Sequence, residues 1–278
     1  MSRFTDKKIV ITGAGGVLCS AFAKHLAAQG AAVALIDLRE EAAAAVADEI
    51  IAAGGTAVAV GANCLDEAAL ITAREKITAA IGTPDILING AGGNNPRGST
   101  DDEFYAAAGT AATAAKTFFD LDNEGFRFVN DLNLLATALP TKVFAKAMAD
   151  SGCGVILNVS SMNAFRPLTK IPAYSAAKAA VSNFTQWLAV YLAKSGVRVN
   201  AIAPGFFVTD QNRPLLFAPD GSPTARTGKI LGNTPMGRFG QPEELLGTID
   251  WLLDDTAAGF VTGIVVPVDG GFSAYSGV

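Results

Sequence analysis

Short apolar runs alternate along the chain with longer alanine-rich or amphipathic stretches. The apolar runs predict strands at 8–12, 32–37, 57–61, 85–89, 155–160, 198–202 and 263–267. The longer stretches predict helices at 16–29, 40–53, 66–81, 126–150, 173–194 and 243–253, with Asp66 as an N-cap and Pro140 as a kink. Strands that are apolar throughout are typical of parallel sheets covered by helices on both faces. We therefore expect one α/β domain over residues 1–278, a doubly wound parallel sheet of about seven strands.

Two segments interrupt this alternation, one near 93–125 and the other near 206–240. The first is rich in Ala, Thr and Asp, and the second is rich in Pro, Gly, Asn and Arg. Long connections in a compact domain are usually functional or mobile. Both follow the carboxyl ends of expected strands, where open α/β sheets bind ligands. We expect them to be insertions that recognise the substrate.

Composition excludes several classes of protein. Hydrophobic residues make up 50% of the chain and charged residues 17%, which argues against a disordered chain. A net charge of −5 argues against nucleic-acid binding, and no apolar run is long enough for a membrane helix or a signal peptide. The three cysteines and the single His25 lack metal-ligand spacing, so we expect no metal and a reducing, cytoplasmic location.

A glycine-rich stretch follows the first expected strand. It reads T-G-A-G-G-V-L-C, with Cys19 in the last glycine position of a T-G-x-x-G-x-x-G pattern. Glycines let the backbone approach a pyrophosphate, and the following helix N-terminus attracts its charge. Glycine also serves ordinary strand-to-helix turns, and a side chain at Cys19 has to fit between helix and sheet. The position after the first strand favours a dinucleotide site.

Asp37 ends the second expected strand, at the distance from the glycines where an acidic residue binds the adenosine ribose hydroxyls. Its charge would repel a 2′-phosphate, so NAD is favoured over NADP, although Arg39 could soften that preference. The alternative is that Asp37 only caps the next helix.

Tyr174 and Lys178 lie four residues apart, on one face of an expected helix. A tyrosine has a pKa of about 10, and a nearby ammonium group lowers it, which would suit a general acid/base. Such a pair is usually only a helix face. Here Ser161 ends the fifth expected strand and Asn133 lies in the preceding helix, while Asn89, Gly90, Ala91 and Gly92 follow the fourth strand.

Together these motifs resemble the short-chain dehydrogenase/reductase family over essentially the whole chain. The resemblance implies a Rossmann fold and four catalytic residues. Tyr174 would be the general acid/base, Lys178 would bind the nicotinamide ribose and lower the Tyr174 pKa, Ser161 would bind the substrate oxygen, and Asn133 would hold a relay water. The glycine pattern departs from the family's commonest T-G-x-x-x-G-x-G form.

The resemblance also implies which residues hold the cofactor. Asn63 would contact adenine and Thr209 the nicotinamide carboxamide. The predicted cofactor-binding set is Gly13, Gly15, Gly16, Val17, Leu18, Asp37, Leu38, Asn63, Cys64, Asn89, Gly90, Ala91, Gly92, Tyr174, Lys178, Pro204, Gly205, Val208 and Thr209.

Five further strings are similar to the subgroup of D-mannonate oxidoreductases, or fructuronate reductases. They lie at 88–96, 163–178, 207–213, 234–240 and 268–278. This similarity implies NAD-linked interconversion of D-mannonate and D-fructuronate. Family resemblance also implies that the C-terminal tail packs in a homotetramer, the alternative being a frayed end.

A sugar acid needs amides for its hydroxyls and a cation for its carboxylate. The predicted substrate-binding residues are Asn94, Arg97, Ser161, Asn163, Arg166 and Arg213, with Asn95, Lys170, Gln211 and Asn212 also offered by the loops. We expect at least one of Arg97, Arg166, Lys170 and Arg213 to bind the carboxylate.

Three alternatives stay open. Another sugar-acid or polyol dehydrogenase, such as a gluconate 5-dehydrogenase, would differ only in the substrate loops. A ketoacyl carrier-protein reductase is disfavoured by Asp37 and the acidic net charge. A non-enzymatic NAD-binding regulator is disfavoured because all four catalytic residues are present.

Overall fold

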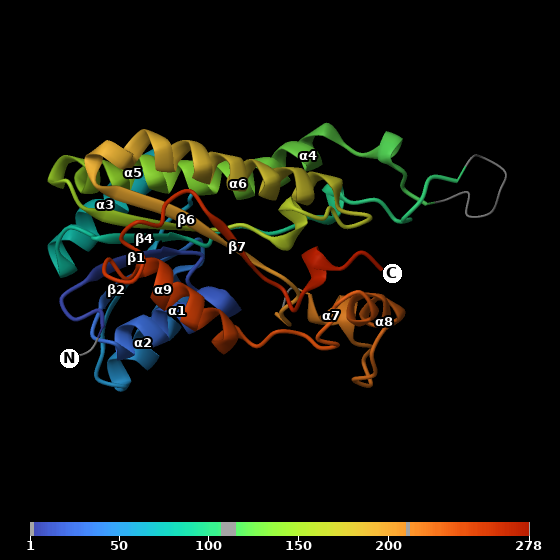
Figure 1. The fold of residues 1–278 in the computed structure, drawn as a ribbon, viewed down its shortest axis with the longest axis horizontal. Helices are drawn as coiled ribbons and strands as arrows, with labels where there is room; N and C mark the ends of the chain where they lie inside the picture. Colours follow the sequence, from blue (N-terminus) through green and yellow to red (C-terminus); the bar gives the residue numbers. More distant parts are fainter. Residues whose placement is uncertain (1–2, 107–114, 210–211, 278) are drawn as a thin grey trace.

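The computed structural model describes residues 3–106, 115–209 and 212–277. Within them, seven strands form one parallel sheet in the order β3-β2-β1-β4-β5-β6-β7 (Figure 1). The strands are β1 (Lys8–Thr12), β2 (Ala32–Asp37), β3 (Thr56–Gly61), β4 (Ile86–Asn89), β5 (Gly154–Val159), β6 (Val197–Pro204) and β7 (Val265–Val268). The order reverses between β1 and β4, which makes their carboxyl ends the switch point where such sheets bind ligands. The predicted doubly wound fold is confirmed.

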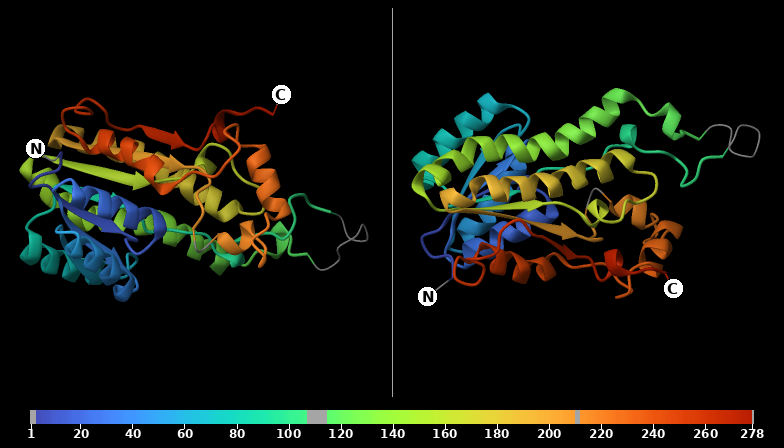
Figure 2. Two further views of the ribbon diagram at one scale, coloured as in Figure 1. Left: turned by 90° about the horizontal axis from the view of Figure 1, so that it is seen from below. Right: turned by 45° about the horizontal axis from the view of Figure 1, so that its top comes forward.

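Helices cover both faces of the sheet (Figures 1 and 2). One face carries α1 (Val17–Ala28), α2 (Glu40–Ala52) and α9 (Leu246–Leu253). The other carries α3 (Glu67–Ile81), α5 (Ala136–Ser151) and α6 (Pro172–Leu192). Asp66 caps α3 as predicted, because its carboxylate accepts hydrogen bonds from the Ala68 and Ala69 amides.

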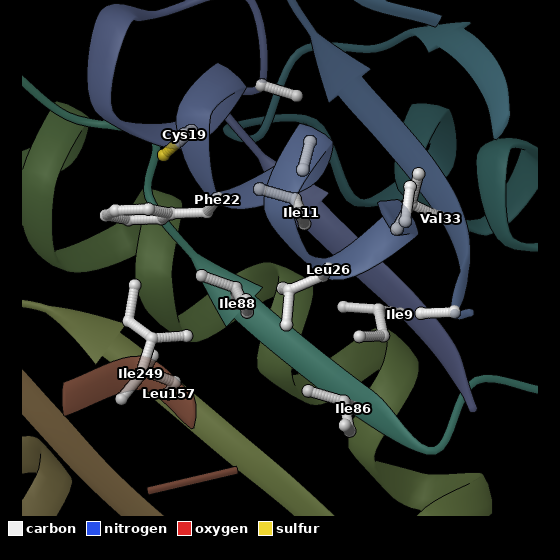
Figure 3. Packing of buried hydrophobic residues seen from close by; sticks show 14 of the residues in the cluster. Ile9, Ile11, Cys19, Phe22, Leu26, Val33, Ile86, Ile88, Leu157 and Ile249 are labelled. Atoms are coloured by element: carbon white, nitrogen blue, oxygen red, sulfur yellow. The ribbon is translucent and has the colours of Figure 1, made fainter. Parts of the chain in front are cut away.

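The core divides into two clusters, one on each side of the sheet. Alternate residues of each central strand point to opposite clusters, so Ile9 and Ile11 pack with α1 while Val10 packs toward α3 and α5. Figure 3 shows the first cluster, with Leu26 of α1 over Ile9, Ile86 and Ile88. Burial on both faces explains why the strands are apolar throughout.

The helix predicted at 126–150 is in fact two helices and a distortion between them. The first helix, α4 (Asn123–Asn130), begins three residues earlier than predicted, and a π-helical turn at Asp131–Leu135 joins it to α5. The Asn133 amide donates to the Val129 carbonyl, and the Thr137 hydroxyl donates to the Asn133 carbonyl. Helix α5 runs through Pro140, and the π-helical turn lies before it, at Asp131–Leu135.

The segment 206–240 is not the plain loop that its composition suggested. It contains α7 (Arg213–Leu216) and α8 (Ala225–Gly232), which lie beyond the carboxyl end of the sheet with α4 and the C-terminal tail (Figure 1). The segment 93–125 contains short 3-10 turns at Pro96–Gly98 and Phe118–Asp120. Among the described residues, no helix is both long and apolar enough to span a membrane.

Candidate active site

Tyr174 and Ser161 meet at the carboxyl edge of the sheet. Pro172 opens α6, which places the half-buried Tyr174 in its first turn. Ser161 follows β5 by two residues and caps a 3-10 turn, Met162–Ala164, by accepting a hydrogen bond from the Asn163 amide at 3.2 Å. The Ser161 side chain also hydrogen-bonds Tyr174. A hydroxyl and a phenol are thus held together where a carbonyl oxygen could bind both.

Lys178 lies one helical turn after Tyr174 and is almost completely buried, with 4% of its surface exposed. Its Nζ donates a hydrogen bond of 2.8 Å to the Val159 carbonyl and lies 5.8 Å from the Tyr174 ring centroid. Burial lowers the pKa of Lys178 to about 8, because an ammonium group loses hydration there. The side chain is still mostly cationic at neutral pH.

The structure corrects the predicted direction of the Tyr174 pKa. Burial raises this pKa, and the hydrogen bond with Ser161 opposes the change only in part. The expected lowering by Lys178 is wrong for this structure, because the Lys178 ammonium is turned to the Val159 carbonyl. Tyr174 therefore retains its proton at neutral pH.

Asn133 faces the same place from the π-helical turn. Its amide donates to the Gly93 carbonyl at 2.8 Å, and its Oδ1 accepts from the Gly93 amide at 3.2 Å. A Cβ on Gly92 would come 2.7 Å from the Asn133 Oδ1 and 3.2 Å from the Lys178 Nζ. The loop after β4 therefore lies between Asn133 and Lys178, which brings all four predicted catalytic residues to one edge of the sheet.

The glycine-rich turn after β1 lies against the loop after β4. Gly13 has a φ of +67°, and a Cβ there would come within 2.9 Å of Ala91. The Thr12 hydroxyl accepts hydrogen bonds from the Gly90 and Ala91 amides at 3.1 and 3.2 Å. Gly16 leads into α1, whose first turn has neither a side-chain cap nor an acidic residue. Such a helix start is suited to a pyrophosphate.

Cys19 fits because its partner across the interface is a glycine. A Cβ on Gly90 would lie only 2.1 Å from the Cys19 Sγ, so the thiol occupies space that a larger residue would need. Figure 3 shows Cys19 on α1 beside Phe22, at the edge of the core. Burial raises the pKa of Cys19 to about 12, so the thiol is an inert packing group.

Asp37 belongs to the glycine-rich turn and not to a helix cap. Its carboxylate accepts hydrogen bonds of 3.0 Å from the Gly15 amide and from the Arg39 amide. Helix α2 begins after Arg39 without a side-chain cap, so the alternative in which Asp37 caps it is wrong. A half-buried negative charge therefore lies beside the glycine-rich turn.

Two predicted cofactor residues direct their side chains elsewhere. Asn89 is buried, and its amide donates to Thr141 and Asn158, so its side chain ties β4 to β5 and α5 and is not available to a cofactor. Cys64 is buried in the core cluster below α3, where burial raises its pKa to about 12. Any cofactor contact of these two residues has to come from the backbone.

The other predicted cofactor residues lie along the same edge. Asn63 is exposed after β3, and Leu38 is exposed after β2. Val17 and Leu18 start α1, Pro204 ends β6, and a Cβ on Gly205 would come 2.6 Å from the Asp269 Cα. The half-buried Val208 and Thr209 follow, and the Thr209 amide donates to the Asn212 Oδ1 at 2.8 Å.

Most predicted substrate cations already have partners. Arg97 is paired with Asp122 at 2.6 Å, the Arg166 Nε donates to the Ser273 carbonyl, and Arg213 lies 5.9 Å from the Phe217 ring centroid. The Asn94 amide donates to Ser99. Asn163 is buried next to Ser161, and its Oδ1 has no partner among the described residues. Gln211 lies outside the described residues.

Sequence reasoning missed a cluster of cations on α8. Arg226 and Lys229 line a cavity of about 420 Å³ together with Lys170, one of the cations offered by the loops. The signal was present in the sequence, since two cations three residues apart share one face of a helix. It was missed because the surrounding Pro, Gly and Asn suggested a loop.

Among the described residues, no group of three or more His, Cys, Asp or Glu side chains could hold a metal ion. His25, the only histidine in the sequence, lies in the last turn of α1, and its Nε2 is 2.9 Å from the Asp250 Oδ1. The groups that the structure brings to this edge are a hydroxyl, a phenol, an ammonium and an amide.

Comparison with known proteins agrees with this geometry. Residues 7–216 match the family model of short chain dehydrogenases. An uncharacterized oxidoreductase of Haemophilus influenzae is 59% identical over 98% of this chain and 95% of its own. The uncharacterized oxidoreductase UxuB of Bacillus subtilis is 53% identical over 99% and 98%. A Haemophilus structure with bound NAD, provisionally assigned as a D-mannonate oxidoreductase, superimposes with a TM-score of 0.94 at 58% identity, covering 99% of this chain and 98% of that one. The chain therefore belongs to the short chain dehydrogenase family and is an oxidoreductase.

Proposed function

We propose that this protein uses NAD to interconvert D-mannonate and D-fructuronate. The observation that carries the reaction type is the meeting of Ser161, Tyr174 and Lys178 at the carboxyl edge of the sheet. The substrate is supported by the 58% identity, over nearly the whole chain, with the Haemophilus protein assigned to D-mannonate. The sugar-acid subgroup motifs of the sequence point to the same substrate.

The glycine-rich turn fits a dinucleotide. A Cβ at Gly13 or Gly15 would collide with Ala91 or Ala42, so the turn has the bare backbone that a pyrophosphate needs. The Asp37 carboxylate beside it would accept ribose hydroxyls and repel a 2′-phosphate, which favours NAD over NADP. When bound, the nicotinamide supplies or accepts the hydride.

The side chains of the catalytic residues supply and return the proton. Tyr174, whose raised pKa keeps it protonated, donates its phenolic proton to the carbonyl oxygen in the reductive direction. Ser161 holds that oxygen by a hydrogen bond, and Lys178, whose Nζ lies 5.8 Å from the Tyr174 ring centroid, would bind the nicotinamide ribose. In our proposal Asn133 positions a water that returns the proton to Tyr174.

The homotetramer and the cytoplasmic location stay predictions.

The test is NADH oxidation by the purified protein with D-fructuronate, compared with NADPH and with 5-keto-gluconate, tagaturonate and simple ketones. NADH-dependent turnover of D-fructuronate far above the other compounds would support the proposal. Turnover of another keto acid alone would keep the chemistry and reject the substrate. NADH binding without turnover of any carbonyl compound would favour a regulator.

A further inference from the structure

A cavity of about 420 Å³ opens between α8, the loop before α6 and the C-terminal tail. Three features of its lining matter: the cations Lys170, Arg226 and Lys229, the anion Glu103, and the rings of Phe206 and Phe272. A volume of this size is typical of small-molecule sites. The cavity joins both insertions of the fold, since Glu103 comes from the first and α8 from the second.

The charges of this cavity do not cancel. Lys229 and Glu103 form an ion pair at 2.7 Å and neutralise each other. Lys170 and Arg226 are half-buried and share the field of the same Glu103 carboxylate, whose pKa they help to lower, but neither forms an ion pair of its own among the described residues, so three cations face one anion. A charged group that is partly withdrawn from water without a partner is costly. Two such cations facing one cavity indicate that its ligand is an anion.

Lys170 lies in the loop that leads into α6, so the cavity and the catalytic edge share this segment of the chain. Lys170 precedes Tyr174 by four residues and adopts a left-handed backbone with a φ of 71°. Its carbonyl accepts a hydrogen bond from the Thr100 amide at 2.8 Å, which fixes the strained loop. Strained non-glycine residues persist where the surroundings hold them, and they cluster at ligand sites.

An apolar wall stands beside these cations. Phe206, the residue after Gly205, contacts Phe272 edge to face, with ring centroids 5.6 Å apart. Aromatic rings suit the C–H groups of a carbon chain, and the cations suit a carboxylate. The cavity therefore matches a molecule that presents C–H groups to the rings and has one anionic end.

We infer that this cavity receives the carboxylate end of the sugar acid, with Arg226 and Lys170 contacting its oxygens and Phe206 and Phe272 lining its carbon chain. The inference rests on the proposed function and names its specificity-determining residues. It assigns the carboxylate to Lys170 and Arg226 in preference to the other candidate cations, because Arg97 is ion-paired with Asp122, the Arg166 Nε donates to the Ser273 carbonyl, and Arg213 lies near the Phe217 ring; none of these three lines the cavity.

The experiment replaces Arg226 and Lys170 separately by glutamine and compares two substrates. D-Fructuronate carries the carboxylate, and D-fructose carries a hydroxymethyl group in its place. We expect each variant to raise the KM for D-fructuronate about tenfold or more, because a charge-assisted contact is lost, with kcat/KM for D-fructose unchanged. The matched control is Arg127→Gln, since Arg127 is an exposed cation on α4 paired only with Glu124.

A binding measurement separates this inference from the proposed function. Calorimetry with D-mannonate and, separately, with NADH should show a weaker D-mannonate affinity and an unchanged NADH affinity in both variants. If the wild type binds and reduces D-fructuronate but the variants keep its KM within twofold, the inference fails and the function stands. Equal losses on D-fructuronate and D-fructose would also overturn the inference.

If the wild type neither binds D-mannonate nor reduces D-fructuronate, the proposed function fails. The same variants are then assayed on the keto acid that the wild type does reduce. A tenfold rise in KM there upholds a carboxylate site, and an unchanged KM, or a wild type that reduces no keto acid at all, overturns it.

Discussion

The catalytic floor and the cationic cavity are built in opposite ways. The floor consists of Asn133, Ser161, Tyr174 and Lys178, and three of these side chains are bonded to main-chain groups of the loop after β4, of β5 or of the turn that follows it. The cavity is lined by long charged side chains from α8, the first insertion and the loop before α6, and Lys229 of its one ion pair among the described residues is largely exposed. The floor is part of the folded core, whereas the cavity is lined by partly exposed side chains from elements outside the sheet.

This difference separates rate from specificity. Groups held by the backbone do not adjust to a ligand, so they suit a proton transfer that needs fixed geometry. Side chains on a helix outside the sheet can change without disturbing the core, and they suit the choice of substrate. Substitutions in the floor should therefore act on kcat, and substitutions in the cavity should act on KM.

The largest effect is expected from Tyr174→Phe. This change removes the phenolic proton and leaves the ring, so kcat should fall by about 10²–10⁴-fold while the NADH Kd stays the same. Steady-state kinetics and NADH fluorescence titration measure the two quantities. A parallel loss of NADH binding would mean that α6 itself was damaged and that the floor is not a separate unit.

Lys178→Met tests whether burial of the Lys178 ammonium lowers the stability of the folded protein. The pKa of Lys178 falls from 10.5 to about 8 on folding, so between these values the unfolded chain binds more protons than the folded one. The free energy of unfolding contributed by Lys178 therefore rises with pH over this window, by up to about 3 kcal/mol. Turnover should be lost in the variant, together with this contribution.

The measurement is the difference between wild type and variant in denaturant unfolding from pH 7 to pH 10.5. A difference is needed because burial raises the pKa of Cys19 and of Cys64 to about 12, which destabilises the protein as pH rises through 9. If the difference between the two proteins did not change with pH, folding would not lower the Lys178 pKa.

Asp37→Asn tests whether the Asp37 charge selects NADH over NADPH. The amide keeps an acceptor for the Gly15 N–H but removes the charge. The ratio of kcat/KM for NADH to that for NADPH should fall by about tenfold, because repulsion of the 2′-phosphate is lost. An unchanged ratio would show that Arg39 or another group selects the cofactor.

Glu103→Gln should have the smallest effect and should act on the cavity alone. It frees Lys229 and adds a third unpaired cation, so the KM for the sugar acid should fall about twofold to threefold at low salt. The KM for D-fructose should not change. A rise in both KM values would instead show that the Glu103–Lys229 pair holds α8 against the first insertion.

Local patterns determined much of this protein. The apolar runs determined the strands, because burial on both faces leaves no room for polar residues, and the spacing of Tyr174 and Lys178 placed both on one turn of helix. The Asn133 position was also predictable, but its π-helical turn was not, since that distortion depends on contacts with Gly93 in another loop.

Only the tertiary structure decided which polar groups are free. In the sequence Arg97, Arg166, Arg213 and Lys170 are equivalent cations, and Asn89 and Asp37 are two polar residues at strand ends. In the fold, Arg97 forms an ion pair with Asp122, and Asn89 joins a buried hydrogen-bond network. Lys170 has no ion pair of its own among the described residues and lines the same cavity as Arg226 of α8. Periodicity records which face of an element is buried, but the partner of a charged side chain comes from segments far apart in the chain, and packing alone brings those segments together.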